Sequence, residues 1–595
     1  MEKLNQTWDL DVFYPGGSES PQLWQELDSL EEEIREFEQY LAEASKEDPK
    51  KILPEIIEKT QEIQKRLRKP GTVIHCLLAQ NVKDENAKVL RGKMSQLNAT
   101  FGAITAKLDD LMLELSDNDW NELMATEPLK SISFALSEAR ENLKEKLAPN
   151  IEAIITQLSV DGYHAWSSLY STIAGRMSID AEIDGTKRTL SIGQANNLLD
   201  HQNREVRKEV FYKLEEAWEK NSDLVASALN HIGGYRLNLY NNRGWESVLK
   251  EPIKRNRIEP ETLQAMWDAI EEGKPKVVKY LEKKAELLGL EKLSWFDLEA
   301  SVGKTSKNIS YEEAADFVVK NYAVFSSEMA EMAEKAFKER WIEAEDRPNK
   351  DQGAFCAGFP EVNQSRIFMT FGGTTAGIGT LAHELGHAYH SYVTSDLHPM
   401  QRRYPSNLAE TASIFGELLV NDAAIKQATD KLEKLALLEN KVRSTMWFFM
   451  NLHCRFIFEV DFYETRRKGL VRASELNDLM LNAQRKAFCD SLEVYHQYFW
   501  ASKGHFYSTG TPFYNFPYTF GYLFSTGIYA RALEEGPSFA GTYRQLLRET
   551  GMMSVEDLAR KYLDVDLRTL DFWRSAVRLA TSDIDEFIRL ADDVK

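Results

Sequence analysis

The spacing of apolar residues in the first third of the chain constrains its fold most strongly. One apolar series lies in a segment rich in Glu and Gln: Leu23, Leu27, Leu30, Ile34, Phe37 and Leu41. A second series follows a polar turn at about residues 46–54: Ile52, Ile56, Ile63 and Leu67. Steps of three and four residues place each series on one face of a helix. The two runs predict a helical hairpin, because they are too short for a long coiled coil.

Helical spacing continues to about residue 175, and β-prone segments interrupt the chain at two places. Residues 182–192 set an Asp-Gly turn between two short runs, which predicts a hairpin. Residues 354–358 and 366–371 predict two strands, joined through Pro360 and Asn363. Helices resume at Pro260, and again after Thr374 except for an aromatic loop at about residues 505–520. We therefore expect a mainly α fold with a small β-sheet or hairpin.

Composition and charge exclude several classes of protein. The 43% apolar and 28% charged residues are typical of a globular chain. A net charge of −20 without a Lys/Arg-rich block argues against a nucleic-acid partner. Neither a signal segment nor an apolar stretch of about 18 residues is found, so we expect a soluble, cytoplasmic protein outside the membrane. The widely spaced cysteines predict four buried free thiols: Cys76, Cys356, Cys454 and Cys489.

A metal-binding motif follows the predicted strands. The segment Thr380-Leu-Ala-His-Glu-Leu-Gly-His-Ala-Tyr-His390 contains His-Glu-x-x-His, and a four-residue step puts His383 and His387 on one helix face. Two neutral imidazoles so placed can hold one zinc ion. Glu384 can then take a proton from the metal-bound water and pass it to a leaving nitrogen. Chance produces the motif in roughly one chain in fifty of this length, so its context matters.

The context of the motif supports a helix. Thr374 or Thr375 can cap it, and Gly386 removes bulk beside the metal face. A catalytic zinc also needs a third protein ligand. The metzincin pattern would require Gly where His390 stands and His where Val393 stands, so it does not apply.

A glutamate on a following helix is the remaining common ligand, and Glu410 lies 23 residues after His387. With Asn407 as N-cap, Glu410 could also complete a capping box, which does not exclude metal binding. Glu417 could accept a hydrogen bond from a ligand imidazole, or be a solvated surface residue. His390 could contact the ligand residues or line a substrate channel.

Aromatic residues are dense from Tyr495 to Ser525. Such clusters more often form a core than a catalytic site. Here, however, several hydroxyl groups and a histidine accompany Gly and Pro, which offers hydrogen-bond donors on a loop. The candidate donors are His505, Tyr507, Tyr514, Tyr518 and Tyr522.

Taken in order, these segments closely resemble the oligoendopeptidase F branch of the thimet oligopeptidase family of zinc metallopeptidases. The resemblance rests on the His-Glu-x-x-His segment, Ala409-Glu410-Thr-Ala-Ser with Glu417, His505-Phe-Tyr and Gly521-Tyr-Leu-Phe. The opening Trp8-Asp-Leu-Asp-Val-Phe-Tyr14 is also similar, so the likeness spans most of the chain.

The resemblance implies a multi-helix bundle that encloses a deep channel, one zinc ion at its floor, and cleavage of short peptides rather than folded proteins. His383, His387 and Glu410 would bind zinc, and Glu384 would be the base. His505 with Tyr514, Tyr518 or Tyr522 would donate hydrogen bonds to the oxyanion. The strand at 366–371 would pair with substrate backbone. We expect a helical hairpin region (1–110), a helical N-terminal domain of this family (111–200) and a catalytic domain (201–595).

Three functions fit these observations. The leading hypothesis is a zinc endopeptidase. A catalytically silent peptide-binding scaffold would require a lost ligand or base, and none is missing. A zinc exopeptidase could use the same residues but would need a free peptide terminus. The sequence leaves the oligomeric state and the preferred cleavage site open.

Overall fold

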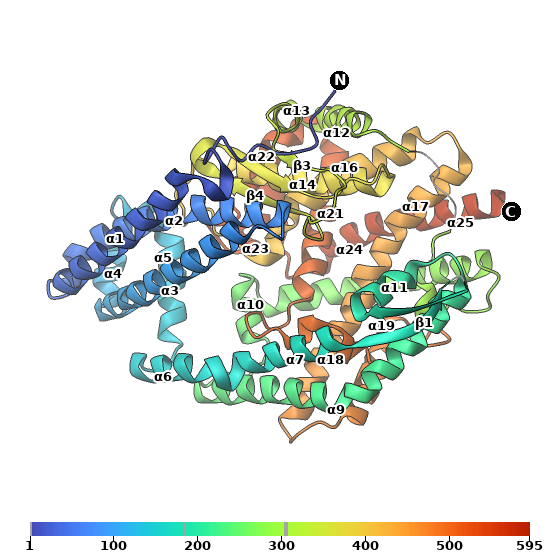
Figure 1. Cartoon of the computed structure of the whole chain (residues 1–595), viewed down its shortest axis with the longest axis horizontal. Coiled ribbons are helices and arrows are strands. Elements are labelled where there is room, and N and C mark those ends of the chain that lie inside the picture. The colour runs from blue at the N-terminus through green and yellow to red at the C-terminus, as the bar shows by residue number, and fades with distance from the viewer. Residues whose placement is uncertain (1–2, 184, 303–307, 595) are drawn as a thin grey trace.

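The computed structural model describes residues 3–183, 185–302 and 308–594, and it is built mainly of α-helices (Figure 1). The predicted hairpin is confirmed: α1 (Pro21–Ala44) packs against α2 (Pro49–Gln80), and α3 (Glu85–Glu114) covers both. The apolar series of α1 is buried at this contact. The turn between the helices is shorter than predicted, because Pro54 lies inside α2.

The first β-prone region is confirmed as a hairpin. Strands β1 (Ser178–Ile183) and β2 (Thr186–Ser191) pair antiparallel, while Asp184 of the predicted turn lies outside the described residues. Four helices come between α3 and the hairpin along the chain: α4 (Asp117–Met124), α5 (Ser133–Lys144), α6 (Pro149–Ser159) and α7 (Ala165–Arg176). Two helices follow it: α8 (Ile192–Asn197) and α9 (Arg204–Asn242).

A three-stranded sheet precedes the metal-motif helix. Its order is β3 (Ile342–Glu343), β5 (Gln364–Phe368), β4 (Phe355–Phe359), with β3 parallel and β4 antiparallel to β5. The two predicted strands are confirmed. However, the expectation that the 366–371 strand pairs with substrate is wrong, because β5 is the middle strand and the open edge belongs to β4. Between α9 and β3 the described residues form α10 (Lys250–Arg255), α11 (Pro260–Leu287), α12 (Tyr311–Phe325) and α13 (Ser327–Lys338).

Helices dominate the rest of the chain, as predicted, but two details differ. The chain is irregular at 394–405 and 488–498, and α21 begins at Phe516, inside the predicted loop. The helices are α14 (Thr375–Val393), α15 (Ser406–Ala409), α16 (Thr411–Gln427), α17 (Lys431–Met446), α18 (Leu452–Arg466), α19 (Ala473–Ala487), α20 (Phe499–Ser502), α21 (Phe516–Glu535), α22 (Ala540–Arg548), α23 (Val555–Leu563), α24 (Leu570–Ala580) and α25 (Ser582–Asp593).

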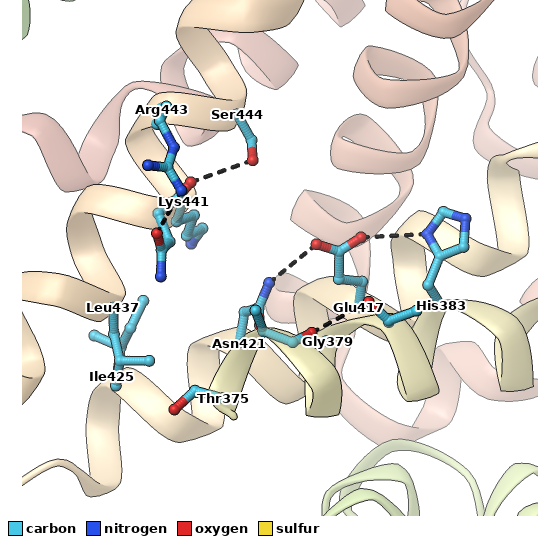
Figure 2. A pocket seen from close by; sticks show the side chains of 13 residues that line it. Thr375, Gly379, His383, Glu417, Asn421, Ile425, Leu437, Lys441, Arg443 and Ser444 are labelled. Carbon is cyan, nitrogen blue, oxygen red and sulfur yellow. Dashed lines mark hydrogen bonds and ion pairs between the residues drawn. The ribbon is translucent and has the colours of Figure 1, made fainter. Parts of the chain in front are cut away.

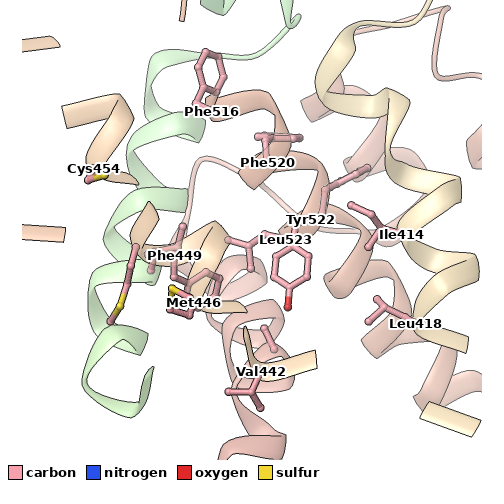
Figure 3. Close-up of a cluster of buried hydrophobic side chains, with 14 of the residues drawn as sticks. Ile414, Leu418, Val442, Met446, Phe449, Cys454, Phe516, Phe520, Tyr522 and Leu523 are labelled. Atoms are coloured by element: carbon pink, nitrogen blue, oxygen red, sulfur yellow. The ribbon is translucent and has the colours of Figure 1, made fainter. Parts of the chain in front are cut away.

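Two hydrophobic cores hold these elements together. One core contains buried apolar side chains between Trp8 and Leu143 together with Phe359, Phe368 and Met400. The N-terminal helices therefore pack on the sheet. The other begins at Tyr163 and includes apolar side chains from α16, α17 and α21 (Figure 3). None of the described helices combines the length and apolar composition that crossing a membrane requires.

The helices α14 and α16 pack together unusually closely at Gly386. A Cβ at this position would lie 2.6 Å from the Ser413 Cα atom and would also overlap the Ala412 carbonyl oxygen. Gly386 therefore serves this helix contact rather than clearing space beside the metal face, as its sequence suggested. The contact matters for the site, because it fixes α16 against the helix that carries His383 and His387.

We expect Gly386→Ala to lower the free energy of unfolding by about 2 kcal/mol, because backbone atoms must move to admit the methyl group. Gly541→Ala is the matched control, since a Cβ there meets nothing within 4 Å. Urea unfolding of both variants measures the effect. Equal midpoints for the two variants would show that the close approach carries no such cost.

Candidate metal centre

The helix α14 presents the two histidines of the motif side by side. Thr374 is its N-cap, as predicted, and accepts a hydrogen bond from the Gly377 backbone N–H at 3.1 Å. The capped helix holds the rings of His383 and His387 with their centroids 5.0 Å apart and their planes 82° apart. Each ring can therefore direct a nitrogen toward a common point without stacking on the other.

Glu410 approaches both rings from the junction of α15 and α16. Its Oε2 atom lies 3.2 Å from Nε2 of His383 and 3.6 Å from Nε2 of His387. The Ser413 hydroxyl donates to the same oxygen at 2.9 Å. The alternative of a capping box is not observed: α15 begins at Ser406 after Pro405, and Glu410 follows its last residue.

These three side chains fit a tetrahedral zinc ion. Their ligand atoms all lie within 4.8 Å of one another. Metal–ligand bonds of about 2.0–2.2 Å in a tetrahedron put ligand atoms about 3.3 Å apart. The two distances from Glu410 are close to that value, and nitrogen with carboxylate oxygen is a donor set that zinc accepts.

The charges around the three side chains also favour a cation. Burial works to lower the pKa of His383, but hydrogen bonds to Glu410 and Glu417 raise it to about 10. Burial raises the pKa of Glu410, yet the two histidines bring it down to about 2. Burial lowers the pKa of His387 to about 4, so this ring stays neutral and free to bind metal. The carboxylates thus stabilise positive charge at the point where the three side chains meet.

Glu417 is tied to the site and is not a free surface residue. Its Oε2 atom lies 3.3 Å from Nδ1 of His383, and the amide of Asn421 donates to its Oε1 atom at 3.3 Å. Figure 2 shows Glu417 between these two partners. A carboxylate on Nδ1 orients the ring so that Nε2 faces Glu410. Of the two alternatives left open by the sequence, the contact to a ligand imidazole is the one observed.

The surroundings of Glu384 differ from those of Glu410 in hydrogen bonding and in their effect on the pKa. Only 5% of its surface is exposed, and its buried Oε2 atom has no hydrogen-bond partner. Burial raises its pKa to about 7, against an opposing effect of His383. A carboxylate of this kind holds a proton readily near neutral pH.

A cavity of about 290 Å³ opens beside the ligands, and two of the candidate tyrosines line it. Tyr518 is 36% exposed there, and its hydroxyl lies 3.4 Å from that of Tyr514. Tyr522 also lines the cavity, but its hydroxyl lies 2.9 Å from that of Thr445, whose own proton goes to the Ala580 carbonyl. The Tyr522 proton is therefore directed to Thr445, and its ring packs in the core (Figure 3).

The other three candidates, His505, Tyr507 and Tyr514, are not among the described residues that line this cavity. The ring of His505 stacks on that of Tyr514 with centroids 4.8 Å apart. Tyr507 is fully buried and stacks on Tyr170 with centroids 3.6 Å apart. The structure thus joins His505, Tyr514 and Tyr518 into one cluster and leaves Tyr507 outside it.

Sequence reasoning missed the residues that hold His505. Its Nδ1 atom lies 2.8 Å from Oδ1 of Asn515, and Arg455 donates to that oxygen at 3.0 Å. Burial, and next the charge of Arg455, lowers the pKa of His505. Burial also raises the pKa of Glu459, which lies four residues after Arg455 on α18, to about 7. The available signal was the i, i+4 pair of charges, Arg455 and Glu459, on either side of the apolar run Phe456-Ile-Phe458 in α18.

Two expectations need correction. His390 is 0% exposed, so it lines no channel: its Nε2 atom lies 2.9 Å from the Thr550 hydroxyl, and its ring stacks on Tyr404. All four cysteines are free, as predicted, but only two are buried. Cys356 is half-buried and Cys489 is exposed.

Comparison with known sequences identifies the family. Residues 197–577 match the sequence profile of peptidase family M3, and residues 112–178 match that of Oligopeptidase F. The chain belongs to peptidase family M3. This places it among the zinc metallopeptidases, in the oligopeptidase F branch.

The similarity to individual members of family M3 extends over the full length of the chain. The chain is 23% identical to Oligopeptidase PepF of Bacillus subtilis (strain 168), covering 100% of this chain and 88% of that protein. It is 23% identical to an Oligoendopeptidase F homolog of Lactococcus lactis subsp. lactis (strain IL1403), covering 99% and 98%. Its fold is similar to the crystal structure of oligoendopeptidase-F from Enterococcus faecium, with a TM-score of 0.72, 18% identity, and coverage of 96% and 99%.

Proposed function

We propose that this M3 oligopeptidase is a zinc-dependent endopeptidase of short oligopeptides, with one zinc ion held by His383, His387 and Glu410. One observation carries the proposal. Three ligand atoms from two separate elements converge within 4.8 Å, next to a buried glutamate whose Oε2 atom has no partner. The full-length similarity to oligopeptidases supports a peptide as substrate. The deep channel expected from the sequence is part of this proposal.

Different residues of the site bind the metal, transfer the proton and orient the metal-binding side chains. When bound, zinc would polarise the scissile carbonyl and lower the pKa of a water molecule. Glu384 accepts the proton of the attacking water at Oε2 and delivers it to the leaving nitrogen. His383, His387 and Glu410 hold the metal, and Glu417 keeps the ring of His383 in the required orientation.

Charge on the oxyanion is stabilised by hydroxyl donors from α21 and the segment before it. Tyr518 lines the cavity beside Glu410, and its hydroxyl is within reach of that of Tyr514. His505 gives its Nδ1 proton to Asn515, so in its neutral form it supports Tyr514 by stacking rather than by donating a hydrogen bond. Tyr522 contributes through packing, since its proton is directed to Thr445.

Digestion of a ten-residue peptide, blocked by acetyl and amide groups, tests the function. We expect internal fragments in the mass spectrum, no fragments after removal of metal with a chelator, and recovery when zinc is added back. An exopeptidase would leave a doubly blocked peptide intact. A silent scaffold would release no fragments at any zinc concentration. Either result would refute the endopeptidase proposal.

A further inference from the structure

A second cavity, of about 700 Å³, lies between the N-terminal helices and the open edge of the sheet. Its walls come from α2, α3, β4 and the segment 399–403, and α2 and β4 lie side by side in Figure 1. Four cationic side chains line it: Lys65, Arg68, Arg402 and Arg403. None of its described lining residues is Asp or Glu. This concentration of positive charge stands out in a chain whose net charge is −20.

Arg402 carries the clearest sign of a missing acceptor. Its Nε and Nη1 atoms are buried and have no hydrogen-bond partner. Burial, then the neighbouring Arg68, lowers its pKa, and only Glu361 acts in the opposite direction. Within the described part of the chain, none of the four cations forms an ion pair. Buried donors without acceptors are costly, so this arrangement favours an anionic ligand.

Arg68 connects the cavity to the edge of the sheet. Its Nη2 atom donates to the Gly358 carbonyl oxygen at 3.5 Å, so this carbonyl faces outward, away from β5. In an antiparallel pair, alternate residues turn both backbone groups to the same side. Gly358 and Cys356 therefore offer their N–H and C=O groups at the open edge. A peptide that adds to this edge passes directly beside Arg68.

The same edge leads back to the metal centre. Strand β4 packs directly on α14, the helix that carries Glu384. A Cβ at Gly358 would lie 3.1 Å from the Ser391 hydroxyl on α14. Tyr404, two residues after Arg402, stacks on His390 of the same helix with centroids 4.2 Å apart. Strand β4 thus spans from the helix of the site to the basic cavity.

We propose that this cavity binds a carboxylate of the peptide substrate, contributed by its C-terminus or by an Asp or Glu side chain, and so makes the enzyme prefer anionic peptides. The inference rests on the proposed peptidase function and adds the charge class of its substrate. Arg402 and Arg68 are the residues that set this specificity, because one has unpaired buried donors and the other borders the peptide-binding edge.

Matched peptide pairs test the preference. One pair compares a free C-terminal carboxylate with an amide, and further pairs exchange Glu for Gln at each position of a doubly blocked peptide. We expect kcat/KM of the wild-type enzyme to be about tenfold or more higher for the anionic member of at least one pair. The pair that shows the difference identifies the source of the carboxylate. Equal values in every pair would overturn the inference while leaving the peptidase function standing.

Charge-neutral variants assign the preference to the cavity. In Arg402→Gln the ratio of kcat/KM between anionic and neutral peptide should fall from about ten toward about one. Arg68→Gln should lower it in the same direction, and it serves as the second variant if the first unfolds. Arg91→Gln, which removes an exposed arginine of α3, should keep the wild-type ratio. An unchanged ratio in the Arg402 or Arg68 variant refutes the assignment. Failure of the wild-type enzyme to cleave any peptide would refute both this inference and the proposed function.

Discussion

Replacing Glu384 by glutamine is expected to lower kcat by about a thousandfold while the protein keeps its zinc. Glutamine has almost the shape of glutamate but cannot take up a proton, and general-base catalysis contributes about 10²–10⁴-fold. The metal should remain because the three ligand atoms belong to His383, His387 and Glu410. Peptide turnover under saturating substrate and elemental analysis of the purified variant measure the two quantities.

The control for this variant is Glu331→Gln, which removes the same charge from an exposed position on α13. It should retain full turnover and full zinc content. If Glu384→Gln cleaved peptides at the wild-type rate with zinc bound, Glu384 would not be the base. Loss of zinc along with activity would instead mean that Glu384 holds the ligand helix in place and that its role in proton transfer is unsupported.

Local features of the site could be predicted because they depend on neighbours in the sequence. The four-residue step between His383 and His387 fixes their shared helix face, and Thr374 provides its own capping oxygen. The hairpin of α1 and α2 follows equally from apolar spacing, because each helix must bury one face. These elements need no knowledge of distant contacts.

Long-range arrangement could not be read in this way. The order of strands depends on β3, whose two residues carry no detectable pattern, so the sequence does not show that β5 is the middle strand and β4 the open edge. Tyr518 and Tyr522 share one aromatic segment, yet only the fold brings the Tyr518 hydroxyl to that of Tyr514 and the Tyr522 hydroxyl to that of Thr445. The basic cavity joins α2 to a loop more than half the chain away, so its charges could not be grouped beforehand.

Removing the carboxylate of Glu410 is the second change with a large expected effect. Losing a residue that only orients a ligand costs about 10–100-fold in metal affinity, so Glu410→Ala should weaken zinc binding more than about a hundredfold. Zinc at a hundred times its dissociation constant stabilises a protein by about 2.7 kcal/mol, and this shift should largely disappear in the variant. Competition with a chelator and thermal unfolding with and without zinc measure both effects.

Glu417→Gln is the comparison variant, since it keeps an oxygen acceptor near Nδ1 of His383 and should lose less zinc affinity than Glu410→Ala. Wild-type zinc affinity in Glu410→Ala would mean that another group completes the coordination sphere and that the assigned metal centre is wrong.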